Sequence, residues 1–221
     1  MPLELSALEA RVVGCLIEKQ IATPDQYPLS LNALVNACNQ KSNRDPVLNL
    51  EEREVQTVVD ALVRKQVVLE KSGFGSRVKK YHQLFCNTQF GSLKFSPQQT
   101  AIVCELLLRG PQTPGEVRTH AGRLAPIAGL EEVEYALEDL ATRPEGPFVV
   151  KLPREPGRRE ARFAQLFTGP IDIAALTAAQ AAFVPAASGA ASSTLLARVE
   201  SLEGEVADLR DEIAALKARL P

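Results

Sequence analysis

The side chains with the clearest chemical potential are basic and amide groups in the first part of the chain. Arginine and glutamine can each make two hydrogen bonds to the edge of one DNA base, and lysine and arginine neutralise phosphates. Four polar side chains recur at helical spacing, opposite an apolar stripe: Arg53, Gln56, Thr57 and Arg64. Others flank that segment: Lys41, Asn43, Arg44, Lys71, Arg77, Lys79 and Lys80. Together they predict a surface that contacts duplex DNA.

The same charges permit a second interpretation, in which they only keep the surface solvated. Glu51, Glu54 and Asp60 lie on or beside the same segment and would repel phosphate. The net charge of −2 also argues against indiscriminate binding to polyanions. The sequence therefore leaves DNA contact and a merely solvated face both open.

Motifs for catalysis or for cofactor binding are missing from the sequence. There is no glycine-rich phosphate loop, HExxH or GxSxG, and His82 and His120 stand in no recognisable catalytic motif. The four cysteines form no CxxC pair, and most lie in apolar stretches where they would pack as small hydrophobic side chains. We therefore expect a protein that is not an enzyme and that needs no metal or cofactor.

Start signals for helices occur twice along the chain. Residues 6–9 (Ser-Ala-Leu-Glu) predict a capping box, and residues 96–99 (Ser-Pro-Gln-Gln) repeat the device with proline at the first helical position. Thr23-Pro24 is matched by Thr113-Pro114 as a second start signal, although Pro28 delays the first of these helices to about residue 30. The common order indicates an internal repeat.

Each repeat continues with a third helix and two strands. The third helices begin at the same tripeptide, Leu-Glu-Glu, which occurs at 50–52 and at 130–132. Each helix has one apolar stripe. We expect strands at 67–71 and 78–85 in the first repeat and at 148–152 and 161–167 in the second. Three helices followed by a hairpin is the order of a winged-helix domain.

The two predicted third helices differ in charge. A winged helix places its third helix in the major groove of DNA, with the hairpin near the flanking phosphates. The second copy would expose acidic side chains there: Glu131, Glu134, Glu138 and Asp139. Its hairpin is basic, with Arg154, Arg158, Arg159 and Arg162, but protein contact or domain packing suits this copy better than DNA.

The C-terminal region changes character twice. Residues 169–193 are rich in alanine and predict a linker with a short helix around 173–183. Residues 194–221 predict a parallel two-stranded coiled coil, because apolar residues repeat every seven: Val199, Val206, Ile213 and Leu220 at one core position, and Leu195, Leu202, Leu209 and Leu216 at the other. A single helix folding back on its own chain is the alternative.

A long segment resembles a known family. Residues 27–46, together with Gly-Cys-Leu-Ile-Glu-Lys at 14–19, are similar to the bacterial YceH family over roughly residues 5–167. The resemblance implies tandem winged-helix domains and leaves the activity open. The coiled coil need not be shared by all members.

The predicted architecture is α+β and mainly α. We expect winged-helix domains at 1–90 and 91–168, a linker at 169–193 and a dimerising coiled-coil helix at 194–221. No apolar run is long enough to span a membrane and the start of the chain does not resemble a signal peptide, so we expect a cytoplasmic protein. The predicted function is that of a homodimeric regulator that binds DNA through its first domain; the alternative is a scaffold that binds another protein and does not bind DNA directly.

Overall fold

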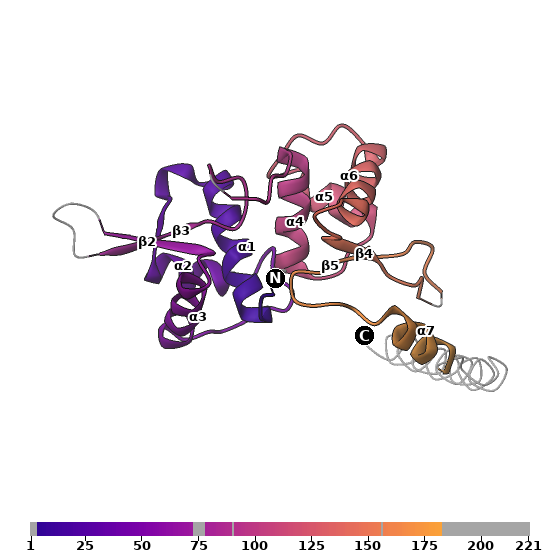
Figure 1. The fold of residues 1–221 in the computed structure, drawn as a ribbon, viewed down its shortest axis with the longest axis horizontal. Helices are drawn as coiled ribbons and strands as arrows, with labels where there is room; N and C mark the ends of the chain where they lie inside the picture. Colours follow the sequence, from indigo (N-terminus) through magenta and orange to yellow (C-terminus); the bar gives the residue numbers. More distant parts are fainter. Residues whose placement is uncertain (1–3, 73–77, 90, 156, 183–221) are drawn as a thin grey trace, which may run out of the picture. The chain divides into compact units, whose positions relative to one another are not determined.

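The computed structural model describes residues 4–72, 78–89, 91–155 and 157–182, and Figure 1 shows their path. Within the described residues the chain is mixed α/β and mainly helical. The first half contains α1 (Ala7–Ala22), a 3-10 turn η1 (Pro24–Gln26), β1 (Leu29–Ser30), α2 (Leu31–Cys38), α3 (Glu52–Arg64), β2 (Val68–Ser72) and β3 (Lys79–Gln83). The second half contains α4 (Pro97–Arg109), α5 (Pro114–Ala121), α6 (Leu130–Thr142), β4 (Val149–Lys151) and β5 (Phe163–Gln165). The helix α7 (Ile173–Ala182) follows and confirms the short helix predicted there.

The predicted helix starts of α1 and α4 are confirmed at the level of single hydrogen bonds. The Ser6 hydroxyl accepts from the amide of Glu9 at 3.2 Å, and the Glu9 carboxylate accepts from the amide of Ser6 at 2.7 Å. Ser96 and Gln99 make the same reciprocal pair at the start of α4. Each box satisfies two backbone amides that have no partner within the helix.

The strands form two small antiparallel sheets. The order in the first is β1-β3-β2, and the second is the pair β4-β5. The two-residue strand β1 was not predicted. Pro28 was expected to delay the second helix to about residue 30, and α2 begins at Leu31. The strand β1 pairs with β3, placing Leu29 opposite the buried Tyr81. The two predicted hairpins are confirmed, with β3, β4 and β5 each shorter than expected.

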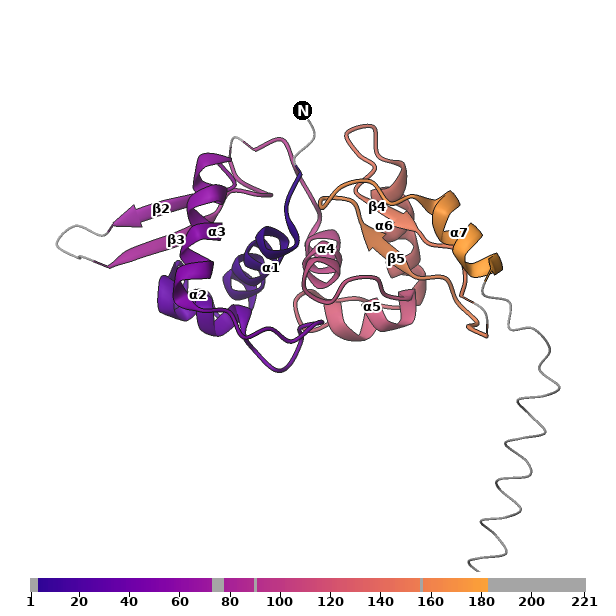
Figure 2. The same cartoon turned by 90° about the horizontal axis from the view of Figure 1, so that it is seen from below.

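The two halves meet where α1 packs against α4, at the centre of a continuous hydrophobic core (Figures 1 and 2). Gly14 allows this approach: a Cβ atom built there would lie 2.8 Å from a Leu108 methyl carbon and 3.3 Å from the Cβ of Leu107. The Cys104 thiol lies 3.4 Å from the Gly14 carbonyl. All four cysteines are buried, which confirms that they pack as apolar side chains. The division at residue 90 stays a prediction, since residues 1–176 form one compact unit.

Among the described residues, no helix is long and apolar enough to cross a membrane. The predicted coiled coil at 194–221 lies outside them, as does Arg77.

Candidate nucleic-acid interface

The helix α3 presents part of the predicted DNA surface. Its apolar stripe, Val55, Val59 and Leu62, is fully buried. Arg53, Thr57 and Arg64 lie on the exposed side, as do several carboxylates. Among the described residues, neither the Arg53 nor the Arg64 side chain has a hydrogen-bond or ion-pair partner, so both guanidinium groups are available to a ligand.

The amide of Gln56 is already engaged within the first half. It donates to the Asp60 carboxylate at 2.6 Å and accepts from the Tyr81 hydroxyl of β3 at 3.2 Å. The Thr57 hydroxyl donates to the carbonyl of Arg53 at 2.9 Å. Contact between Gln56 and a DNA base would therefore require it to leave Asp60, which weakens its role as a base-reading side chain.

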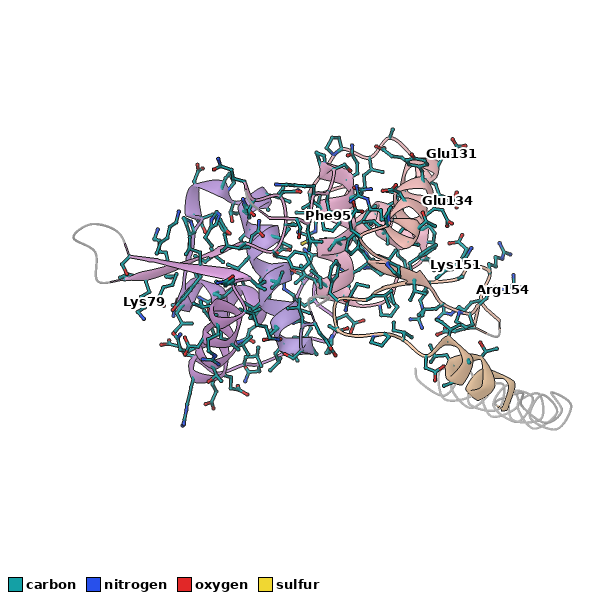
Figure 3. All side chains as sticks on the ribbon, viewed as in Figure 1. Lys79, Phe95, Glu131, Glu134, Lys151 and Arg154 are labelled. Atoms are coloured by element: carbon teal, nitrogen blue, oxygen red, sulfur yellow. The ribbon has the colours of Figure 1, made fainter. Side chains whose placement is uncertain are left out.

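The register of the β2-β3 hairpin sorts its three described lysines onto two faces. Lys71 pairs with Lys80, and Ser72 pairs with Lys79. Side chains alternate along a strand, so Lys79 shares a face with Tyr81, which contacts α3, while Lys71 and Lys80 point to the opposite face. Lys79 is the described hairpin lysine on the α3 side, and Figure 3 shows it near the outer end of the hairpin.

Lys79 is not a free cation on that face. Its ammonium lies 3.0 Å from the Glu70 carboxylate, and this hydrogen bond raises the pKa of Lys79 above its ordinary value. Both groups are solvent-exposed enough for the pair to be weak, so a phosphate can replace Glu70 as the partner at little cost.

One prediction about the loop between α2 and α3 is wrong. Arg44 was expected to contact phosphate, but its side chain is fully buried and pairs with Glu18 of α1 at 2.5 Å. Asn43 is also engaged, because its side-chain oxygen accepts from Arg109 of α4 at 2.5 Å. Lys41 is exposed as predicted. The loop therefore packs Arg44 inside the first half and contacts α4 of the second half through Asn43.

Arg44 belongs to a cluster of charges between the halves that the sequence did not reveal. Glu18 of α1 and Glu105 of α4 are both buried, and the Arg123 guanidinium contacts them at 2.6 Å and 2.5 Å. Arg109 lies 3.1 Å from Glu105. One signal in the sequence could have indicated this cluster: the apolar helices α1 and α4 each contain a glutamate among buried positions. A carboxylate is seldom buried without a partner of opposite charge.

The charge cluster predicts how stability depends on pH. Burial alone would raise the pKa of Glu18, but the hydrogen bond and charge of Arg44, aided by Arg123, lower it to about 2 from an ordinary 4.5. A depressed pKa contributes stability above pH 4.5 that is lost as the pH falls toward 2, here about 3 kcal/mol. Urea unfolding across this range should show that loss in the native chain and a smaller one in Glu18→Gln. Equal pH slopes in the two proteins would contradict the assignment.

The third helix of the second half is more acidic than α3 and has no arginine or lysine. Aligned by their first residues, α6 has Glu131 where α3 has Arg53. Glu131, Glu134 and Glu138 are exposed, and Figure 3 shows the first two on the outer side of the helix. Asp139, also predicted to be exposed, is partly covered: it accepts from Gln99 at 2.6 Å and pairs with Arg143 at 3.2 Å. Three carboxylates along one helix disfavour contact with phosphate.

Comparisons with known proteins show extensive similarity. The family described as "Protein of unknown function, DUF480" matches residues 5–158. The UPF0502 protein VPA1223 of Vibrio parahaemolyticus is 55% identical over 220 residues, which cover 100% of this chain and 98% of the relative. The UPF0502 protein YceH of Escherichia fergusonii is 54% identical over 220 residues, covering 100% and 99%. The similarity thus extends beyond the family match to the C-terminal region.

Proposed function

Because the chain belongs to the DUF480 family, which includes the UPF0502 protein YceH and is described as of unknown function, we propose a function from the folded chain itself. On this proposal the protein is non-enzymatic and cytoplasmic, and it contacts duplex DNA through α3 and the β2-β3 hairpin. Each half is a winged-helix domain, in which the third helix and the hairpin form the contact surface.

The observation that carries this proposal is a pair of arginines on α3 that have no hydrogen-bond or ion-pair partner among the residues that the structure describes. Arg53 and Arg64 lie on the exposed side of the helix, and the hairpin places Lys79 on the face directed toward α3. Arginine can bind a guanine edge or a phosphate through two hydrogen bonds. The second half lacks this pattern on α6, so the proposal assigns one DNA-binding half to each chain.

We further propose that residues 194–221 pair two chains as a parallel coiled coil. The heptad pattern of β-branched residues alternating with leucine supports two strands in parallel. Two chains would then present two α3 helices to neighbouring sites on one duplex. Such pairing raises the affinity for DNA through effective concentration without any new contact.

The test is a titration of the full chain with random and genomic duplex DNA at two salt concentrations. We expect binding that weakens steeply with salt, and a loss of about tenfold or more in the Arg53→Ala, Lys79→Ala double variant. Arg118→Ala, which removes an exposed arginine from α5, is the matched control and should bind normally. Sedimentation of the same samples reports whether the bound species contains two chains.

Two outcomes would count against DNA contact. The first is no binding at micromolar protein and low salt. The second is an equal loss of DNA affinity in Arg118→Ala and in the Arg53→Ala, Lys79→Ala variant. This would mean that exposed basic side chains contribute to binding wherever they lie.

A further inference from the structure

A groove of about 710 Å³ runs between α6 and the β4-β5 hairpin in the second half. Its α6 wall carries Glu134 and Glu138. The hairpin wall carries three basic side chains and one carboxylate: Lys151, Arg154, Arg159 and Glu160. The remaining lining residues, which we call the floor, are apolar: Pro114, Leu152, Ala161 and Phe163. Figure 3 shows Glu134 on α6 and Lys151 and Arg154 on the hairpin side.

The charges on the two walls do not neutralise each other. Within the described part of the chain, the carboxylates of Glu134 and Glu138 have no ion-pair partner, and neither do Arg154 and Arg159. Lys151 places its ammonium 5.8 Å above the Phe163 ring and makes no ion pair there either. Nearby arginines do pair, since Arg162 contacts Glu155 in the same hairpin. The groove therefore keeps charges of opposite sign unpaired on facing walls.

A groove of this kind selects against nucleic acid and in favour of polypeptide. A phosphate backbone drawn to Lys151 and Arg154 would be brought toward Glu134 and Glu138, which repel it. A polypeptide can present basic and acidic side chains on opposite sides and an apolar side chain between them. Such a segment satisfies both walls and covers the apolar floor.

We propose that this groove binds a segment of a partner protein that has lysine or arginine facing α6, aspartate or glutamate facing the hairpin, and an apolar side chain between them. The recognition is electrostatic at the walls and hydrophobic at the floor. It uses only the second half and does not depend on DNA contact by α3, so one chain can bind both ligands.

The probe is a short dye-labelled peptide in which lysine, leucine and glutamate alternate, titrated with the full chain and followed by fluorescence anisotropy. Two reference peptides of equal length contain only lysine with leucine or only glutamate with leucine. We expect the mixed peptide to bind more tightly than both. The Glu134→Gln, Glu138→Gln double variant should bind it about tenfold more weakly, since two charge pairs are lost.

Matched variants separate the groove from general attraction to an acidic helix. Glu131→Gln makes one such replacement at an exposed position of α6 that does not line the groove, and it should bind normally. Lys151→Gln with Arg154→Gln should weaken the mixed peptide, whereas Arg118→Gln on α5 should not.

The proposal is overturned if the lysine-only peptide binds as tightly as the mixed one, or if Glu131→Gln weakens binding as much as the groove variants. It is also overturned if the mixed peptide does not bind at all. Because every groove variant keeps α3 intact, normal DNA titrations in these proteins would show that the two proposals stand or fall separately.

Discussion

Replacing Arg44 by alanine should lower the free energy of unfolding by about 3–5 kcal/mol. The guanidinium is fully buried and donates two hydrogen bonds to Glu18, at 3.1 Å and 2.5 Å, and one to the carbonyl of Ala37. Its removal leaves the buried Glu18 carboxylate with Arg123, which is shared with Glu105, and with the Lys19 ammonium at 3.4 Å. Urea unfolding followed by circular dichroism measures the change.

Two controls make this expectation specific. Arg53→Ala removes an exposed arginine and should change stability by less than about 0.5 kcal/mol. Glu18→Gln with Arg44→Met removes both charges and should recover part of the loss, because no uncompensated carboxylate remains. A change near zero in Arg44→Ala would mean that this arginine lies at the surface and would restore it as a candidate for phosphate contact.

Replacing Gly14 by valine should cost about 2 kcal/mol, at the contact between α1 and α4. The first added atom would already meet Leu108 at 2.8 Å and 2.9 Å, and valine adds two further methyl groups. The gain in helix propensity over glycine is below about 1 kcal/mol and does not offset the overlap. Thermal or urea unfolding of the variant measures the difference.

The partner side chain provides the control. Leu108→Ala opens space beside Gly14, so the double variant should be more stable than the sum of the two single changes predicts. Strict additivity would indicate that position 14 does not face Leu108. Gly14→Ala, which adds only the first atom, should fall between the native chain and valine.

Local sequence signals predicted the elements well. Helix starts depend on two or three neighbouring residues, so Ser6 with Glu9 and Ser96 with Gln99 were sufficient to place α1 and α4. The apolar stripe of α3 likewise fixed which of its side chains are exposed. β1 escaped prediction because two residues have no period, and its existence depends on pairing with β3, far along the chain.

The candidate site was only partly predictable. The predictions that failed concern residues that make contacts with distant segments of the chain. Arg44 has the composition and surroundings of a surface loop, and only the approach of α1 and its Glu18 buries it. Asn43 is taken up by Arg109, a residue of the other half. The face on which Lys79 lies depends on strand register, which hydrophobicity alone did not define.

The contact between Gly14 and Cys104 has an evolutionary consequence. Counted from their capping serines, the two residues hold the same position in α1 and α4, and they touch each other. Equivalent positions meet in this way across the two-fold axis of a homodimer. In a homodimer, a change in one codon alters the residue on both sides of the axis. In this chain Gly14 and Cys104 are encoded separately, so a change in one codon alters one side only. The acidic side chains of α6 and the arginines of α3 can therefore change independently of each other.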